Sequence, residues 1–526
     1  MTRPSRSELS RRDFLRLAGL GAGMTAISLV PGAKNFLNAG VGITKAAAQM
    51  TGTLRVGWTP PVSLDPALFN DAPDISIGIS IYDYLVMLDA KSNVVPHLAK
   101  SWAISDDGKE YTFTLESGVK FSDGSDFSAE DVKFTFDRLK DEKTGSAAKS
   151  LFDSVTAIDA VDATTVKFTL SEPSAVFLKS LTDYHTCIIK NGTTDPATTY
   201  IGTGPFTADS IDVTDRALFT AKSDYWKAGQ PKVSSLELVF AKDTTANVQA
   251  LQGGQLDWVA RIPIEQFVQL QNDANLTTIN IATNQWPNIR IRADRGPGQD
   301  VRVRQALKYA TDRDALNEVI YKGLATVGRD SPVGPLYSYY SEETPIYAHD
   351  PAKAKALLAD AGFPDGLTLD FYGPKGEFNS DELVQALAEQ WKEAGITVNI
   401  KLADASIYYA EGANNWLDAD LGITNWASRP DPQSYLELAF KSDGIWNEAH
   451  WKDEELDALI AETRTQTDDA KRAEAFKTIQ KIFIERGPSI IPYFQPALAA
   501  QSKKVSGIEL AADPGLTSFA NAEVSA

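Results

Sequence analysis

The segment NWASRPDPQSY, residues 425–435, brings together side chains that could hold a small molecule. Arg429 carries a forked guanidinium that suits a carboxylate, a phosphate or the hydroxyl groups of a sugar, and Trp426 offers a flat face for a ring or an alkyl chain. Two prolines stiffen the backbone around Arg429. A second interpretation uses the same residues, because an ion pair between Arg429 and Asp431 would brace a rigid surface turn. The residues themselves leave both interpretations open.

Patterns typical of catalysis or of a bound cofactor are missing from the sequence. The four histidines lie far apart, without the HExxH spacing of a zinc site, and no GxSxG or GxGxxG pattern occurs. Carboxylates are plentiful and identify nothing, since a glycosidase has a similar composition. The single cysteine, Cys187, excludes an intramolecular disulfide, and its apolar neighbours predict packing in a buried strand. We therefore expect no cofactor, no metal site and no enzymatic activity, with an exported hydrolase as the alternative from a different class.

The N-terminus has the features of an export signal. Arg11 and Arg12 precede an apolar run of 14 residues, Leu17 to Val30, and a small-residue site ends at Ala48. This segment resembles a twin-arginine signal peptide, which implies cleavage after Ala48 and export of the folded protein by the twin-arginine machinery. The apolar run is shorter than the roughly 20 residues of a membrane span. We expect a soluble periplasmic or extracellular protein without a lipid anchor, because no cysteine stands at the cleavage site.

Length and charge restrict the class further. A chain of 526 residues suggests about three domains at roughly 150 residues each. The net charge is −19, and it falls to −24 for residues 49–526 because residues 1–48 hold seven basic and two acidic side chains. Such an acidic surface repels polyphosphates, so nucleic acids are not expected as partners.

Periodicity predicts a mixed α/β chain. Alternating apolar residues predict strands at 53–57, 111–115, 164–170 and 396–402. Capping signals predict helices after Ser128 and after Asp350, and further helices over 380–395, 453–464 and 468–486. Apolar residues from Val303 to Ile320 predict one helical face that ends at Gly323. Without a repeat period, this mixture indicates several α/β lobes.

Six segments in order carry a family resemblance. They are VVPHLAKSWAISDDGKEYTFTLESGVKFSDGSDFSAEDVKFTFDR (94–138), GTGPF (202–206), SDYWKAGQPKV (223–233), DVRVRQALKYATDRDAL (300–316), DPAKAKALLADAGFPDG (350–366) and WKDEELDALI (451–460). Over almost all of 53–510 the chain resembles the extracytoplasmic solute-binding proteins of ABC importers, in the peptide/nickel-binding family (family 5) that includes oligopeptide- and dipeptide-binding proteins.

The resemblance implies a two-lobed periplasmic-binding-protein-like fold of class II type, with an extra inserted α/β lobe and thus three lobes in all. The implied boundaries are 49–83, 190–283 and 493–526 for lobe I, 84–189 for lobe II and 284–492 for the closing lobe III. A monomeric receptor of this kind captures a peptide or another small polar solute between lobes I and III. It then delivers the solute to the permease subunits of a membrane complex and, through them, to the ATPase.

The resemblance also implies which residues line the cleft. The expected ligand contacts are Trp58, Asp71, Trp286, Arg292, Asn425, Trp426, Ala427, Ser428, Arg429, Trp446 and Asn447. In peptide-binding members an aspartate near the position of Arg429 pairs with the peptide ammonium, so the arginine here puts a classical peptide ligand in doubt. An oligosaccharide or a small anionic, opine-like solute remains as an alternative. Strand alternation places Arg290 and Arg292 on one face, either toward the cleft or in solvent.

Overall fold

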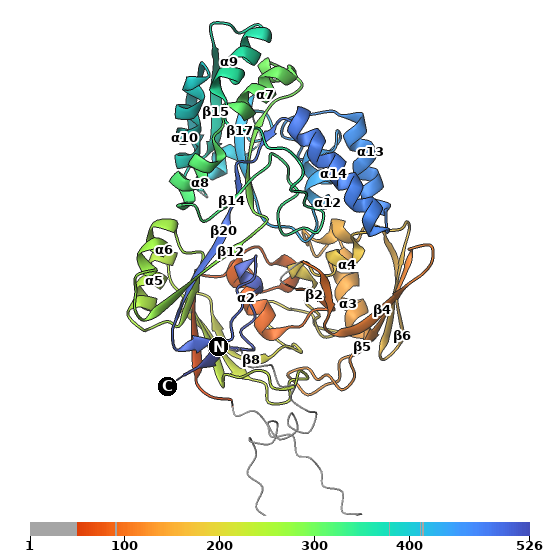
Figure 1. The fold of residues 1–526 in the computed structure, drawn as a ribbon. Coiled ribbons are helices and arrows are strands. Elements are labelled where there is room, and N and C mark those ends of the chain that lie inside the picture. Colours follow the sequence, from red (N-terminus) through yellow and green to blue (C-terminus); the bar gives the residue numbers. More distant parts are fainter. Residues whose placement is uncertain (1–49, 90–91, 378, 411, 413–414, 526) are drawn as a thin grey trace, which may run out of the picture. The chain divides into compact units, whose positions relative to one another are not determined.

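The first predicted strand, β1 (Thr53–Trp58), lies at the centre of a seven-stranded sheet. The computed structural model describes residues 50–525 apart from 90, 91, 378, 411, 413 and 414 (Figure 1). The export signal predicted over 1–48 lies outside the described residues. The strand order is β12-β20-β11-β1-β10-β9-β8. The other strands are β8 (Phe206–Asp212), β9 (Arg216–Ala221), β10 (Ser235–Phe240), β11 (Trp258–Ala260), β12 (Leu276–Ala282) and β20 (Pro496–Ser502).

Three distant pieces of chain therefore share this sheet, and we call 50–83, 190–283 and 493–525 together the seven-stranded region. Its helices are α2 (Ala72–Ile81), α5 (Thr244–Gln252) and α6 (Ile264–Leu270), and a short pair, β21 (Val505–Ser506) with β22 (Glu523–Val524), lies near the end of the chain. Two apolar clusters fill it, and Trp58 packs edge-on against Trp258 in the larger one, at 5.6 Å between ring centroids.

The four-stranded region, residues 84–189, is built on an antiparallel sheet with the order β4-β5-β7-β6. Its elements are β2 (Val86–Leu88), β3 (Val94–Pro96), β4 (Ala99–Ile104), β5 (Glu110–Leu115), α3 (Ala129–Lys140), β6 (Val155–Asp162), β7 (Thr165–Leu170) and α4 (Phe177–Ser180). As predicted, Ser128 caps α3, in a capping box with Asp131. Every second residue of β5 and β7 is buried, and Phe136 packs edge-on against Phe168 at 5.1 Å inside the resulting core.

The five-stranded region, residues 284–492, has the strand order β16-β15-β17-β13-β18. These strands are β13 (Trp286–Ile291), β15 (Leu367–Pro374), β16 (Ile396–Ala403), β17 (Leu421–Trp426) and β18 (Ser489–Ile490). Its helices are α7 (Val301–Tyr309), α8 (Arg313–Tyr321), α9 (Pro351–Asp360), α10 (Ser380–Glu393), α11 (Ala405–Tyr408), α12 (Gln433–Tyr435), α13 (Glu454–Thr465) and α14 (Asp469–Arg486). In the described part of the chain, no helix has the length and apolar content needed to cross a membrane.

Two local predictions were wrong. The apolar residues from 303 to 320 do not form one helical face, because Asp312 caps a new helix by accepting a hydrogen bond from Ala315 N, and Val319 is 57% exposed. The flank of Cys187 is a short 3-10 helix (Tyr184–Thr186) followed by extended chain outside any sheet, although the thiol is fully buried as expected.

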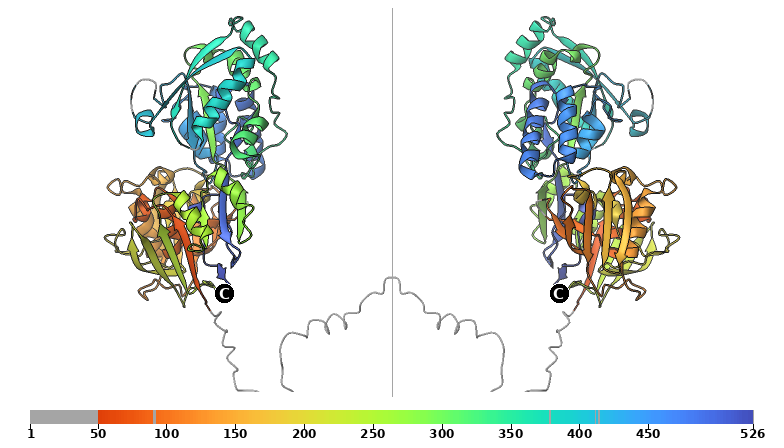
Figure 2. Two further views of the ribbon diagram at one scale, coloured as in Figure 1. Left: turned by 90° about the vertical axis from the view of Figure 1, so that its left-hand side faces the viewer. Right: turned by 90° about the vertical axis from the view of Figure 1, so that its right-hand side faces the viewer.

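Two chain segments connect the seven- and five-stranded regions. The residues after β12 and the residues before β20 run next to each other in both views of Figure 2. Thr283 Oγ1 donates to Gln495 O at 2.6 Å, and Gln495 N donates to Gln285 O at 2.8 Å. The Gln495 side chain also donates to Asn425 Oδ1 at 3.2 Å, so this connection is bonded directly to strand β17. The short strands β14 (Thr326–Val327) and β19 (Tyr493–Phe494) pair beside it.

Candidate ligand-binding site

The loop over residues 427–432 leaves the sheet where three strands end together. Strands β15, β16 and β17 are parallel to one another, so their carboxyl ends meet at one edge of the sheet. Ligands of open α/β sheets bind outside such carboxyl ends. Tyr435 and Tyr337 hold the loop in place, because their hydroxyl groups donate to Ala427 O and Arg429 O at 2.7 Å each. Ser428 Oγ accepts from Asn284 N at 3.1 Å and anchors the loop to the connection.

The guanidinium of Arg429 has no hydrogen bond or ion pair with any described residue. Its Nε atom is buried and lacks an acceptor, although the side chain as a whole is half-buried. Leaving a buried donor unpaired costs about 1–3 kcal/mol, and more when the group is charged. This site can therefore gain binding energy from a ligand that accepts hydrogen bonds and carries negative charge.

The turn-brace interpretation of Arg429 is wrong, because Asp431 has other partners. Asp431 accepts two hydrogen bonds from the Arg472 guanidinium, at 3.0 and 3.1 Å, and Lys179 Nζ lies 3.3 Å from its carboxylate. Within the described residues no ion pair joins Asp431 to Arg429.

Asp183 and Tyr184 of the four-stranded region interact electrostatically with Arg429, and Asp513 of the seven-stranded region interacts with Asp183. Burial raises the pKa of Asp183, but its hydrogen bonds with His185, the charge of His185 and, to a smaller extent, the charge of Arg429 outweigh burial and hold that pKa below its ordinary value. Burial and Asp183 raise the pKa of Tyr184 to about 12, whereas Arg429 acts in the opposite direction. Burial also raises the pKa of Asp513, and the nearby Asp183 adds to this effect. Groups from all three regions therefore meet at this place.

Asp71 belongs to the same neighbourhood. Its carboxylate pairs with Arg261 at 2.5 Å, and both residues influence the pKa of Asp513. Arg261 has a positive φ of 56°, a backbone conformation that is uncommon for residues other than glycine. The sequence reasoning missed Asp183, Tyr184, Arg261 and Asp513. Only the Asp513-Pro514-Gly515 turn signal was visible beforehand, and it does not indicate a ligand.

Three of the expected tryptophans lie inside apolar cores. Trp58 is 3% exposed and donates through Nε1 to Ser76 Oγ at 3.0 Å, and Trp286 is fully buried. Trp426 is 6% exposed, stacks on Trp286 at 5.9 Å, contacts Trp446 and donates to Glu448 at 3.2 Å. We correct the expectation that Trp58 and Trp286 contact ligand, since neither has a free ring face, and Trp426 supports the loop from behind.

Asn425 and Asn447 use their amides to hold the protein together. Asn425 bonds to Ser380 Oγ at 3.1 Å and to Gln495 at 3.2 Å. Asn447 donates to the carbonyls of Lys441 and Trp451 and accepts from Trp451 N at 3.1 Å, which closes its own loop. These bonds use both amide hydrogens of Asn447 within the protein.

Arg290 and Arg292 are neither free in the cleft nor in solvent. The Arg290 side chain is fully buried, donates to Ala419 O at 3.0 Å and lies 3.4 Å from Glu448. Burial raises the pKa of Glu448 above its ordinary value, although the charge of Arg290 acts in the opposite direction. The Arg292 side chain is 6% exposed and pairs with Asp294 at 2.7 Å and with Asp418 at 3.5 Å. Both expectations for this pair are therefore corrected.

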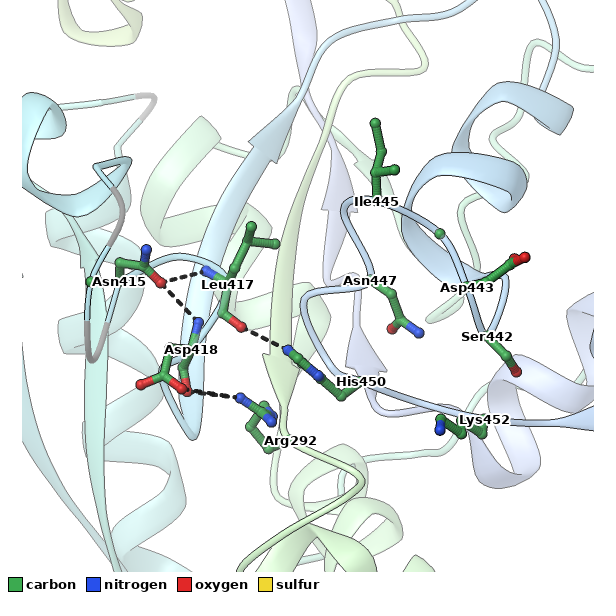
Figure 3. Close-up of a pocket in the computed structure, with 12 residues that line it drawn as sticks. Arg292, Asn415, Leu417, Asp418, Ser442, Asp443, Ile445, Asn447, His450 and Lys452 are labelled. Atoms are coloured by element: carbon green, nitrogen blue, oxygen red, sulfur yellow. Dashed lines mark hydrogen bonds and ion pairs between the residues drawn. The ribbon is translucent and has the colours of Figure 1, made fainter.

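Arg292 and Asn447 line a separate cavity of about 490 Å³ at the amino-terminal end of β17, opposite the 427–432 loop. Figure 3 shows Arg292 directed at Asp418, and His450 directed at the Leu417 carbonyl, which lies 3.0 Å from its Nε2. The structure thus divides the predicted residues between two places. Within the described ranges, no cluster of three or more His, Cys, Asp or Glu residues could hold a metal ion.

A comparison with protein families decides the class. The profile of the bacterial extracellular solute-binding proteins, family 5 Middle, matches residues 93–447. The chain belongs to this family. It is a mixed α/β binding protein of the family 5 type, as predicted, and acts as a substrate-binding receptor for an ABC importer.

Individual relatives agree with this class. The receptor is 29% identical to the glutathione-binding protein GsiB of Escherichia coli K12 over 476 residues, which cover 88% of this chain and 92% of GsiB. The structure of HbpA2 from Haemophilus parasuis is 27% identical, with a TM-score of 0.80 over 90% of this chain and all of HbpA2. The agropinic acid complex of AgaA from A. tumefaciens R10 shares the fold, with a TM-score of 0.74 over 90% of this chain and 99% of AgaA, at 24% identity.

Proposed function

We propose that the receptor binds a small zwitterionic solute of about the size of a short peptide. A ligand carboxylate would pair with the forked guanidinium of Arg429, and a ligand ammonium would lie toward Asp183 and Asp513. The observation that carries this proposal is the Arg429 guanidinium, whose buried Nε atom has no described hydrogen-bond partner and whose charge acts on Asp183 of the four-stranded region. A zwitterion would neutralise both sides at once.

The proposal orders the possible ligands. Glutathione-like peptides come first, because glutathione carries carboxylates and one ammonium group, and the relative GsiB is named as a glutathione-binding protein. Opine-like anions come second, since their carboxylates would pair with Arg429 but they would interact less with the acidic groups nearby. Neutral oligosaccharides come last, because Trp58, Trp286 and Trp426 lack the free ring faces on which sugars stack.

The remaining parts of the proposed cycle rest on the sequence. Arg11 and Arg12 would direct the folded chain through the twin-arginine machinery, and cleavage after Ala48 would release it without a lipid anchor. The mature monomer, with lobe boundaries as predicted, would capture its solute between lobes I and III. It would present the solute to the permease subunits without changing it chemically.

Calorimetry with matched ligands tests the zwitterion proposal. We expect glutathione to bind more tightly than its carboxyamidated and N-acetylated forms, and Arg429→Met to abolish the preference for the free carboxylate while Arg429→Lys keeps part of it. Equal affinity for the charged and blocked forms would refute the proposal. Binding of a maltooligosaccharide alone would favour the sugar alternative, and turnover of a chromogenic peptide or glycoside would favour the hydrolase.

Export has its own test. The double change Arg11→Lys and Arg12→Lys should leave the precursor inside the cell, because the paired arginines identify the signal. Lys34→Arg, a change outside the pair, serves as the matched control. Normal export of the double variant would contradict the twin-arginine assignment.

A further inference from the structure

Direct contacts join the four-stranded region to the five-stranded region. Lys179 Nζ, on α4, lies 3.3 Å from the Asp431 carboxylate and 5.2 Å from the centre of the Tyr339 ring. Ala175 N donates to Arg464 O at 2.9 Å, and the Arg464 guanidinium lies 3.2 Å from Glu172. The ion pair of Arg464 is exposed on both sides, whereas the Lys179 and Asp431 side chains are only 14% and 4% exposed. Of these contacts, the ion pair between Lys179 and Asp431 is the one whose charged groups are buried.

The receiving site on the five-stranded region is preformed. The Arg472 side chain is 1% exposed, donates twice to Asp431 and lies over the Tyr339 ring at 4.7 Å. Asp431 also accepts from Gln433 N at 3.0 Å. Phe476 stacks on Tyr339 at 4.6 Å and fixes the orientation of that ring. Lys179 therefore meets a carboxylate and an aromatic face that other residues of its partner region already hold.

A second pair of opposite charges lies beside the first. Asp183 follows Lys179 by four residues on one side, and Arg429 precedes Asp431 by two residues on the other. Asp183 is buried, it forms a hydrogen bond with His185 at 2.5 Å, and the charge of Arg429 contributes to lowering its pKa. Each segment thus carries one cation and one anion, and Lys179 with Asp431 is the ion pair that joins the two segments among the described residues.

We infer that Lys179 and Asp431 form a charge clasp that closes the four-stranded region onto the five-stranded region. The contact with Lys179 also fixes the loop that carries Arg429. Lys179 is therefore a positioning residue, which acts on ligand affinity through closure and through the orientation of Arg429. This role goes beyond the proposed capture of the solute between the seven- and five-stranded regions. It makes the four-stranded region a participant in the closure of the receptor.

Distances between the two regions test the clasp without ligand. Spin labels at Glu142→Cys and Lys471→Cys occupy side chains that are 88% and 70% exposed, and the native Cys187 is fully buried. We expect Lys179→Met to shift the distance distribution toward longer values, with a roughly five- to tenfold smaller ratio of closed to open forms. Lys179→Arg should keep the distribution of the parent protein. Glu172→Gln, at the exposed pair, should change it least.

A ligand-free distribution that is the same in Lys179→Met as in the parent would overturn the inference. Because this measurement uses no ligand, it remains decisive even if the receptor does not prefer zwitterions. Conversely, if glutathione binds as proposed and the distances do not change in Lys179→Met, the ligand proposal stands and the clasp fails. The variant Asp431→Asn is less suitable for this test, because it also removes the carboxylate that pairs with the buried Arg472 and would therefore lower the stability of the five-stranded region.

Discussion

Arg290 and Arg429 have identical side chains and lie on or next to neighbouring strands of one sheet, but one guanidinium is paired and the other is not. Arg290, on β13, is completely buried and has Glu448 and backbone carbonyl groups as partners. Arg429 follows the adjacent strand β17 and has no described partner for its guanidinium. The difference teaches that the residue type alone identifies a candidate ligand-binding residue. The partners of the side chain decide whether it stabilises the fold or is available to a ligand.

The largest effect is expected when the buried pair is broken. Arg290→Met leaves Glu448 buried without its cation, so the free energy of unfolding should fall by about 3–5 kcal/mol. Urea unfolding of the purified protein measures this loss. The double change Arg290→Met with Glu448→Met should recover most of the stability, because no unpaired charge then remains. If the single variant were as stable as the parent, Arg290 would not have the structural role assigned to it.

Arg429 should show the opposite behaviour. In Arg429→Met we expect the free energy of unfolding to stay the same or to rise by up to about 1–3 kcal/mol, since no protein contact of the guanidinium is lost and a buried unpaired donor is removed. Affinity for a carboxylate ligand should fall by about 2–3 kcal/mol, the scale of a charged hydrogen-bonded contact. Urea unfolding and calorimetry on one preparation separate the two effects. A large loss of stability with unchanged affinity would reverse the comparison.

Asn447 should also contribute to stability, but by a smaller amount than Arg290. Asn447→Ala removes an amide that satisfies backbone groups of Lys441 and Trp451, so we expect a loss of about 1–2 kcal/mol in unfolding free energy. Asn399→Ala is the matched control, because the Asn399 side chain is exposed and its amide donates to Asp370 at 2.8 Å. Equal losses in both variants would show that burial of the amide does not matter.

The smallest effect concerns pH. The hydrogen bond and charge of Arg292 lower the pKa of Asp294 below its ordinary value of 3.8. An acid with a lowered pKa in the folded state adds stability above its ordinary pKa, and this stability is lost as the pH falls through the lower value. Arg292→Met should therefore reduce stability at neutral pH and make its decline below pH 3.8 shallower. Parallel unfolding curves of parent and variant across that range would contradict this assignment.

Local elements were predictable because their signals are local. The alternation of β5 and the cap of α3 at Ser128 depend on neighbouring residues only, and both are confirmed. The apolar period continues through the break between α7 and α8, so periodicity does not reveal it, and the Asp312 cap is the local signal of the new helix. The resemblance to the family supplied the class, which local signals alone did not indicate.

The site was less predictable, for a physical reason. The partners of Arg290 and of Asp431 come from strands and helices far away in the chain, so no local pattern indicates which arginine is satisfied. Asp183 and Asp513 reach the same neighbourhood from different regions. The burial of Trp286 and Trp426 also depends on tertiary packing, since a tryptophan has the same sequence signal in a core and in a cleft.

The bonds of Asn425 have a consequence for protein engineering. Asn425 joins strand β17 to Ser380 on α10 and to Gln495 in the connection between the two regions. A loop transplanted from another receptor to alter ligand choice would therefore change three structural elements if it also replaced this residue. A graft that begins at Ala427, ends before Asp431 and retains Asn425, Ser380 and Gln495 leaves these bonds and the buried pair of Asp431 with Arg472 intact.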